Sequence, residues 1–469
     1  MNEKVARALS YVDERYISAA ARRKRKKRIL PMAVAAALTL AFFLNLPGTP
    51  LILTAGAVAT ASGSQQTARP DSDDYEDHAA WRADLDEWEA EQTLRSETTA
   101  AAMEQLTPFF AAGSVQFLGG GNGENRLWSP VNAYIGLSML TELTAGESQK
   151  QILALFGAAD TDELRRQVSA VWESTYRDRK GHEKSSLANS LGLDKDLSYR
   201  QETMDDLAYY YHTSVYRGEP GSRKMDRAIG AWLNSNTGGL LKDAADQIEL
   251  SPETVLALYS TVYFQAKWSD QFVQKNNTEG VFHAPSGDVK ATFMNKKLAT
   301  MSYYWGDIFS AVSLGLKNGS SMWFILPNEG YTTDDVLSDG QYLQMVLQQN
   351  WENKKHMKVN LSVPKFDVSS TADLKDGLQQ MGVTDVFTFG SADFCAITGD
   401  TPLFLTAANQ SVRVQIDEEG VKAAAYIELP MCGSAEPPDE VIDFVVDRPF
   451  LFAVTSSSVP LFMGAVQQP

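Results

Sequence analysis

The sequence predicts an α+β fold, because two different periods alternate along the chain. Apolar residues recur at helical spacing in four segments, 101–110, 132–143, 149–156 and 162–177. Three short runs rich in β-branched and aromatic residues indicate strands, at 255–266, 311–316 and 321–326. Near the C-terminus, the apolar runs 444–455 and 459–466 flank Ser456-Ser457-Ser458 and predict a buried hairpin.

The length and net charge of the chain limit the number of domains and the kinds of partner that we expect. The chain has 469 residues, more than the usual limit of about 250 to 300 for one core, so length alone suggests two or more domains. Its net charge is −17, which argues against a nucleic-acid-binding protein, since such proteins need a basic face. We therefore expect a soluble acidic domain with no nucleic-acid partner.

The N-terminal segment has the pattern of a membrane anchor. Seven consecutive basic residues, Arg22–Arg28, precede the uncharged stretch Ile29–Leu46, which is just long enough to cross a bilayer of about 30 Å as a helix. Basic residues before the span place 1–28 in the cytoplasm and the rest outside. The alternative is a signal sequence within 29–61, cleaved after Ala61, which would give a secreted protein.

Residues 62–96 are expected to form an acidic linker with a short helix. The first part is polar and poor in aliphatic residues, as in a disordered tether. Trp81, Leu85 and Trp88 then follow at helical spacing. We expect this aromatic stripe to pack on the folded domain, with a separate binding motif as the alternative.

The most informative stretch starts at Glu418 and combines a strand pattern with a loop. One alternate set is apolar: Val421, Ala423, Ala425, Ile427 and Leu429. The other set contains Lys422, Tyr426 and Glu428, so the period is two. Residues 431–439 are rich in small residues and proline, which indicates an exposed loop. Such a segment could insert into a sheet as a strand.

The flanks of this stretch resemble the serpins, and other motifs agree in the family's order over residues 97–469. The matching motifs are Asp417–Gly420 with the alanines after it, Asp447–Phe452, Pro460–Val466, Trp128–Val131, Trp232–Gly239, Val262–Trp268, Phe282-His283, Met322–Pro327, Pro364–Phe366 and Ala392–Phe394.

The resemblance implies one large domain, 97–469, with three β-sheets, eight or nine helices and an exposed reactive-centre loop. It also implies an inhibitor and not an enzyme. In the mechanism that the resemblance implies, a serine protease cleaves the loop, becomes trapped as an acyl-enzyme, and is distorted as the loop inserts into the central sheet. The alternative is a non-inhibitory serpin-fold protein that acts in binding or adhesion.

The family pattern also assigns the parts of the loop. The hinge comprises Glu418, Glu419, Gly420, Val421, Lys422, Ala423, Ala424 and Ala425. The family's spacing places the scissile bond at Ser434-Ala435, with Met431-Cys432 as the second choice. A small residue there favours elastase-like or subtilisin-like proteases. Tyr426 and Ile427 are larger than the residues typical of the family, which bears on the speed of insertion.

The resemblance further implies a buried polar cluster that controls opening of the central sheet, made of Ser129, Asn132, Ser260 and Gln410. Relatives more often have serine, asparagine and histidine at the last three positions. Here an amide and a hydroxyl exchange places, so a satisfied network could survive. Trp268 is expected in the core near the entry point of the loop.

The remaining reactive side chains suggest no cofactor, metal or catalytic site. Five histidines, at positions 78, 182, 212, 283 and 356, are scattered and lack metal-ligand spacing. Cys395 is expected in the core and Cys432 in the exposed loop, which argues against a disulfide. One group of basic residues is expected to form a solvated helix face, with a polyanion-binding site as the alternative: Arg165, Arg166, Arg177, Arg179, Lys180 and Lys184. We expect a monomer whose partner is the target protease.

Overall fold

The structure is a computed structural model, and it describes residues 70–72, 75, 77–175, 177–179, 183–239, 241–348, 351–399, 403–421 and 440–469. Among these, the residues up to Leu94 form one compact unit and those from Arg95 onward a second. No helix within the described ranges has the length and apolarity needed to cross a bilayer. The span predicted within 29–61 lies outside them.

Helix α5, His78–Leu118, is 41 residues long and runs through the segment in which a short helix was expected. Before it, the chain contacts its first turns: the Trp81 indole donates to the carbonyl of Pro70 at 3.2 Å, and the Tyr75 hydroxyl donates to Asp84 at 2.7 Å. The predicted helix at 101–110 is part of α5. The expected boundary between linker and domain at residue 97 falls within this helix.

The described residues contain ten α-helices, of which two are only five and six residues long. The other eight span seven residues or more, in line with the predicted eight or nine. After α5, the other nine of the ten are α6 Pro130–Leu143, α7 Gly146–Leu155, α8 Thr161–Thr175, α9 Gln201–Tyr210, α10 Arg223–Asn236, α11 Lys242–Asp246, α12 Thr333–Asp339, α13 Gln341–Gln348 and α14 Lys375–Gln380. Short 3-10 helices cover Gln274–Asn276 and Asp385–Phe387.

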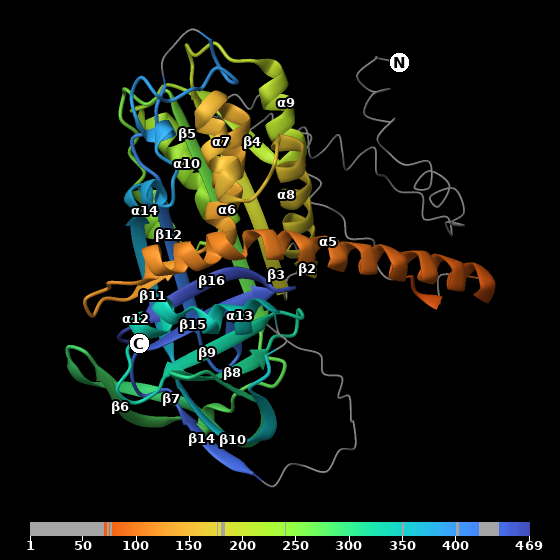
Figure 1. The fold of residues 1–469 in the computed structure, drawn as a ribbon, viewed down its shortest axis with the longest axis vertical. Helices are drawn as coiled ribbons and strands as arrows, with labels where there is room; N and C mark the ends of the chain where they lie inside the picture. Colours follow the sequence, from red (N-terminus) through yellow and green to blue (C-terminus); the bar gives the residue numbers. More distant parts are fainter. Residues whose placement is uncertain are drawn as a thin grey trace. The chain divides into compact units, whose positions relative to one another are not determined.

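The central sheet has seven strands in the order β11-β12-β13-β5-β3-β2, with β4 paired to β3. Its strands are β2 Arg177–Arg179, β3 Glu183–Asp194, β4 Thr213–Gly218, β5 Leu256–Lys267, β11 Phe366–Asp373, β12 Asn409–Ile416 and β13 Gly420–Val421. Helices α6 to α10 gather around this sheet (Figure 1). The two-residue strand β13 lies between β5 and β12, and the candidate site is built around it.

The other nine strands form one hydrogen-bonded array with two parts. One part is β6 Thr278–Ala284, β7 Gly287–Trp305, β10 Lys354–Pro364 and β14 Val441–Val445; the other is β1 Arg126–Trp128, β16 Val459–Val466, β15 Phe450–Ser456, β9 Ser321–Pro327 and β8 Phe309–Gly315. Only the end of β7, Tyr303–Trp305, pairs with β8 and joins the parts. Together with the central sheet they make the three sheets predicted. Helices α12 and α13 lie beside β9 and β15 (Figure 1).

The predicted C-terminal hairpin is confirmed around Ser456–Ser458, where Ser457 and Ser458 have positive φ in the turn. The predicted run 444–455 is wrong as a single strand, because it divides at Val446–Pro449. Its first part belongs to β14, which pairs in parallel with β10. Proline lacks the N–H group that a strand interior requires, so the hairpin strand begins only after Pro449.

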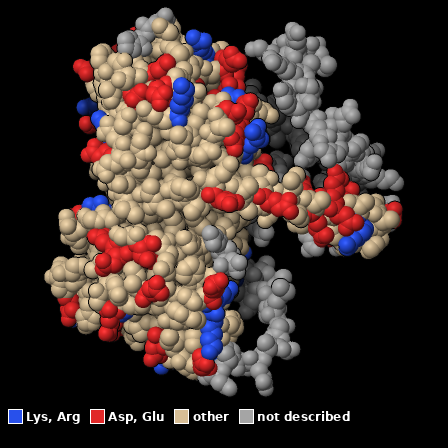
Figure 2. Space-filling model, in the orientation of Figure 1, with Lys and Arg blue, Asp and Glu red and all other residues tan. Residues whose placement is uncertain are grey.

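One large core fills most of the second unit, and a small separate cluster is formed by Trp232, Leu233 and Ala245. The largest fully buried side chains of the large core include Trp128, Trp268, Tyr134, Tyr211 and Phe450. On the face drawn in Figure 2, acidic and basic side chains form small interspersed groups. Among the described residues, no group of three His, Cys, Asp or Glu residues is arranged to hold a metal ion.

Candidate functional site

The site begins at a tight turn that reverses the chain after β12. The backbone N–H of Asp417 donates to the carbonyl of Gly420 at 3.1 Å. The Asp417 carboxylate accepts from the backbone N–H groups of Glu419, at 2.8 Å, and Gly420, at 3.2 Å. An aspartate that bonds the backbone two and three residues ahead is typical of a turn. The chain therefore returns antiparallel to β12, as β13.

Strand β13 pairs with both of its neighbours. Val421 lies opposite Ile416 of β12 on one side and Ala266 of β5 on the other. Gly420 lies so close to β5 that a Cβ atom there would come within 2.3 Å of the Ala266 carbonyl oxygen. Such a distance is far inside van der Waals contact, so only glycine fits at this position.

Glu418 is tied to residues distant in the sequence. Its carboxylate lies 2.9 Å from the Lys365 ammonium and accepts from the side-chain amide of Asn277. Burial opposes ionisation of Glu418, but the hydrogen bonds from Lys365, its own backbone and Asn277 outweigh it and lower the carboxyl's pKa. The backbone carbonyl of Glu418 also accepts from the N–H of Phe272 at 3.2 Å. Glu418 is thus fixed through both its side chain and its backbone.

Trp268 holds the turn from the other side. Its indole N–H donates to the Asp417 carbonyl at 2.8 Å, and its backbone N–H donates to the Glu419 carbonyl at 3.0 Å. The side chain is 1% exposed and meets Phe272 edge to face. Trp268 therefore belongs to the core and also contacts the turn. We call Glu418, Lys365, Asn277 and Trp268 the hinge cluster.

Beyond β13, a cavity of about 500 Å³ separates β5 from β12. Within the described part of the chain, these two strands pair with β13 and not with each other. Residues Tyr259–Phe264 of β5 and Asn409–Gln415 of β12 line the two sides of the cavity. Residues of α10, α11 and the following segment Gln247–Leu250 border it as well. The central sheet thus has a gap that continues the line of β13.

The four predicted polar residues meet at this gap. The Gln410 amide accepts from the Ser129 N–H at 2.9 Å, and donates to the Ser129 carbonyl and to Asn132 Oδ1, both at 3.0 Å. Asn132 Nδ2 in turn donates to the Ser260 hydroxyl at 3.0 Å. These bonds connect β12, α6 and β5 across the gap. We call Ser129, Asn132, Ser260 and Gln410 the polar cluster.

The polar cluster consists of neutral groups whose hydrogen-bonding needs are largely met. Ser129 and Gln410 are 2% and 7% exposed, and the Ser129 hydroxyl donates to the Leu461 carbonyl at 2.6 Å. A buried amide left without partners would cost about 1 to 3 kcal/mol, so this network stabilises the arrangement in which it forms. The structure brings the four residues together; their control of sheet opening stays a prediction.

The rest of the predicted loop lies outside the described residues. This applies to the hinge residues Lys422, Ala423, Ala424 and Ala425 and to both candidate scissile bonds, Ser434-Ala435 and Met431-Cys432. The structure places only Glu418, Glu419, Gly420 and Val421 of the hinge. The assignment of the cleaved bond therefore stays a prediction.

Two predictions about single side chains are wrong. Cys395 is exposed and not in the core, because it follows the buried Phe394 in a loop and turns outward; its N–H donates to Asp393 at 3.0 Å. The burial argument against a disulfide with Cys432 therefore no longer holds. Arg165 does not lie on a solvated helix face: its side chain is 17% exposed and paired with carboxylates from two other helices.

Sequence reasoning missed the partners of Glu418. In the sequence, Lys365 stands out only as part of the Pro-Lys-Phe motif, and no pattern distinguishes Asn277. They lie 53 and 141 residues from Glu418. The one usable signal was the hinge acid itself, since a carboxylate fixed beside a buried tryptophan needs a cation or several donors.

Comparison with known proteins gives the same family throughout. A family model described as "Serpin (serine protease inhibitor)" matches residues 110–469. The chain is 28% identical over 360 residues to alpha-1-antiproteinase S of Cavia porcellus, covering 74% of this chain and 85% of the relative. It is 26% identical over 397 residues to plasminogen activator inhibitor 1 of Sus scrofa, covering 81% and 96%.

Solved structures show the same fold. The thermophilic serpin tengpin in its native state matches with a TM-score of 0.68 at 23% identity, over 78% of this chain and 93% of tengpin. The native stressed conformation of AtSerpin1 from Arabidopsis matches with a TM-score of 0.67 at 24% identity, over 80% and 98%. A complex of thyroxine-binding globulin with thyroxine also matches, with a TM-score of 0.63 at 21% identity over 80% and 99%.

Proposed function

Because the chain belongs to the serpin family, we propose that it is an extracytoplasmic inhibitor that traps serine proteases covalently. The single observation that best supports this is the gap between β5 and β12, with β13 already paired to both strands at one end. A strand that continues β13 would fill the gap. Serpins in general are inhibitors and not enzymes, and we assign this chain no catalytic residue.

The register of β13 gives the facing of the inserted strand. Val421 lies opposite Ala266, and continuing this antiparallel register puts Ala423 opposite Phe264 and Ala425 opposite Val262. On the other side, Ile416 faces Val421, so Ala423 meets Val414 and Ala425 meets Val412. Phe264, Val414 and Val412 are each 4% exposed. The apolar set of the loop would thus face the core.

Farther along, the same register brings Ile427 opposite Ser260 and Gln410, at the polar cluster. Lys422 would lie between Gln265 and Gln415 on the other face of the sheet. Insertion would then place no charge on the core face of the sheet, which avoids a cost of several kcal/mol. Residues 421–434 would form a strand of roughly 45 Å.

The chemical step depends on the catalytic serine and histidine of the target protease. The protease's serine Oγ attacks the carbonyl carbon of Ser434, our preferred site, and the bond to the Ala435 nitrogen breaks. The protease's histidine gives the leaving amine its proton, and an ester joins the two proteins. Insertion must carry the ester away before water hydrolyses it. The energy comes from main-chain hydrogen bonds, each worth about 1 kcal/mol, formed along the gap.

The hinge cluster would hold the chain in place at the N-terminal end of the inserting segment. Glu418 and the turn are held by Lys365, Asn277 and Trp268, so the chain before Gly420 has a firm attachment. Because Gly420 permits a close approach to β5, the strand can begin directly after the turn. We therefore assign Glu418 and Trp268 to anchoring, and residues from Val421 onward to insertion.

We also propose that residues 1–28 stay in the cytoplasm and that the serpin domain lies outside as a monomer, either anchored by 29–61 or secreted after cleavage at Ala61. The basic run Arg22–Arg28 before the apolar segment supports this orientation. Digestion of intact cells by an added protease should remove the serpin domain and spare the N-terminal segment. Protection of the whole chain would contradict the orientation.

The inhibitory proposal is tested by incubating the full-length protein with an elastase-like and a subtilisin-like protease. We expect a complex that survives boiling in detergent, with a mass equal to the protease plus the chain up to Ser434. A protease whose catalytic serine is blocked should give no complex. Cleavage of the loop with no stable complex from either protease would instead support the alternative, a non-inhibitory binding or adhesion protein.

A further inference from the structure

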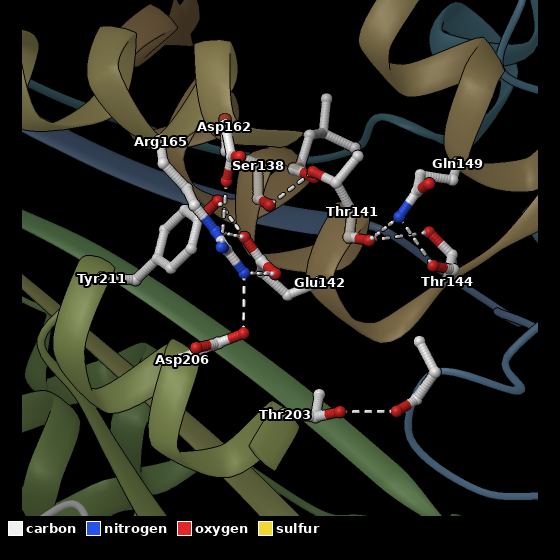
Figure 3. Close-up of polar contacts among 12 residues, drawn as sticks. Ser138, Thr141, Glu142, Thr144, Gln149, Asp162, Arg165, Thr203, Asp206 and Tyr211 are labelled. Carbon is white, nitrogen blue, oxygen red and sulfur yellow. Dashed lines mark hydrogen bonds and ion pairs between the residues drawn. The ribbon is translucent and has the colours of Figure 1, made fainter. Parts of the chain in front are cut away.

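A cluster of charged side chains connects three helices through one guanidinium, whose side chain is 17% exposed. Arg165 of α8 forms two bonds with Glu142 of α6, from Nε at 2.8 Å and from Nη2 at 2.7 Å. The same guanidinium contacts Asp206 of α9 at 2.7 Å and Asp162 of α8 at 3.3 Å. Figure 3 shows it surrounded by these carboxylates, with the Tyr211 side chain beside Glu142. We call Glu142, Arg165 and Asp206 the helix cluster.

The helix cluster is unusual for its location. Glu142 is 8% exposed and lies in the last turn of α6, where the helix dipole disfavours an acid. Removing it from water there requires a cation and further donors, which Arg165 and the Tyr211 hydroxyl, at 3.0 Å, supply. Burial opposes the charge on Arg165, but Glu142 reverses that effect and raises the guanidinium's pKa. Glu142 and Arg165 form an ion pair at 2.7 Å.

Helix α9 connects the cluster to the sheet. Tyr211 caps α9, and β4 starts two residues later, at Thr213. The side-chain amide of Asn189, on β3, donates to the Tyr211 carbonyl at 2.7 Å. Strand β3 pairs with β4 on one side and with β5 on the other. Strands β3, β4 and β5 thus form one strand block, which the end of α9 ties to the helix cluster.

Helix α6 holds this strand block at two points. At its N-terminal end, Asn132 bonds to Ser260 of β5. At its C-terminal end, Glu142 bonds to Arg165 and Tyr211, and Arg165 bonds to Asp206. The same α6 residue Asn132 also accepts from Gln410 of β12, on the far side of the gap. Helix α6 therefore sets the position of the block relative to β12.

Seating one more strand between β5 and β12 requires them to stand about 9.6 Å apart, twice the usual strand spacing. The helix cluster is formed in this structure, in which β5 and β12 are separated by the gap. Its contacts stabilise the sheet with the gap, so their loss should favour a sheet in which the strand block has shifted relative to β12. The geometry points to Arg165 as a positioning residue that holds the strand block apart from β12 and keeps the gap ready for the loop.

This inference rests on the proposed function, since it concerns loop insertion. The contact with α9 is the more easily lost of the two, because Asp206 makes one bond to the guanidinium and its side chain is 33% exposed, whereas the Glu142 side chain makes two bonds and is 6% exposed. Asp162 offers a matched control. It contacts the same guanidinium but lies on the same helix, so its loss breaks no connection between elements.

The test measures how fast the full-length protein takes up a synthetic peptide with the sequence of residues 421–434, followed by the shift of the complex on a native gel. We expect Asp206→Ala to slow uptake about threefold and the double variant Glu142→Leu/Arg165→Met to slow it about tenfold, at a temperature well below unfolding. Asp162→Ala should match the wild type. Replacing both members of the buried pair leaves neither charge uncompensated within it.

Two outcomes would overturn the inference. Uptake by folded Asp206→Ala at the rate of Asp162→Ala would show that the contact with α9 does not set the gap. Uptake faster than wild type would show that the cluster holds the gap closed. The melting temperature of each variant separates these effects from a general loss of stability. If the wild type itself took up no peptide, the proposed loop insertion would fail together with this inference.

Discussion

The hinge cluster and the polar cluster lie on the same gap but are built from different groups. The hinge cluster relies on an ion pair, Glu418 with Lys365, at the turn before β13. The polar cluster relies on neutral amides and hydroxyls that bond across the gap. Charge is thus found at the turn, where we propose that the chain stays fixed, and neutral groups are found along the gap, where we propose that a strand inserts. We therefore expect a fall in pH to weaken the hinge cluster, which contains an ion pair, more than the polar cluster, which contains none.

The largest expected effect comes from placing a charge in β13, where the proposed inserted strand begins. Val421→Arg puts a guanidinium between Ala266 and Ile416, at a position now 5% exposed. An unpaired buried charge costs several kcal/mol, so we expect trapping to fall at least about 100-fold and the loop to be cleaved as a substrate. The ratio of complex to cleaved inhibitor on a denaturing gel measures this. Lys422→Arg, at the next position, is the control, and equal trapping by both variants would refute the facing we assign.

Next in size is the loss of an amide from the polar cluster. Gln410→Ala leaves the Ser129 N–H and carbonyl and Asn132 Oδ1 without this partner, and we expect the free energy of unfolding to fall by about 2 kcal/mol. Denaturant unfolding provides the measurement. Exchanging the groups, with Asn132→Ser and Ser260→Asn together, should cost less than Ser260→Asn alone. A double variant less stable than the single one would show that the network does not tolerate exchange.

A smaller effect, dependent on pH, is expected in the hinge cluster. The pKa of Glu418 is lowered in the folded protein, so its charge stabilises the fold above about pH 4.5, its ordinary value, and this contribution is lost as the pH falls through the lower folded value. Glu418→Gln should cost about 1 kcal/mol at pH 7 and less in acid. Unfolding midpoints across pH 3 to 7 test this. A difference from wild type that does not shrink on acidification would contradict the assignment.

The smallest effect is expected one residue later. Glu419 is 59% exposed, and its carboxylate lies 3.7 Å from the Lys267 ammonium. The Lys267 side chain is only 10% exposed, but the contact is long and Glu419 itself lies largely in water, which screens it. Glu419→Gln should therefore change the free energy of unfolding by no more than about 0.5 kcal/mol. The same unfolding measurements test it and make it the control for Glu418→Gln. A loss equal to that of Glu418→Gln would show that the hinge cluster is not specific to Glu418.

Patterns local in the sequence predicted much of the fold. The helix at 132–143 and the strand at 255–266 lie within one or two residues of α6 and β5, because regular period and burial coincide there. The polar cluster was predicted from family resemblance, and the structure brings its four residues together. Pairing that depends on the fold escaped prediction. The Arg165 guanidinium reaches Glu142 and Asp206 only because α6, α8 and α9 pack together, which no spacing in the sequence reveals.

The central claim is that the cut loop joins the sheet between β5 and β12. The most direct test compares the thermal midpoint of the full-length protein before and after a protease nicks the segment 422–439. If the freed strand pairs with both neighbours, its new hydrogen bonds should raise the midpoint by about 10 °C or more. An unchanged or lower midpoint after complete nicking would mean that the gap accepts no strand, and would contradict the account.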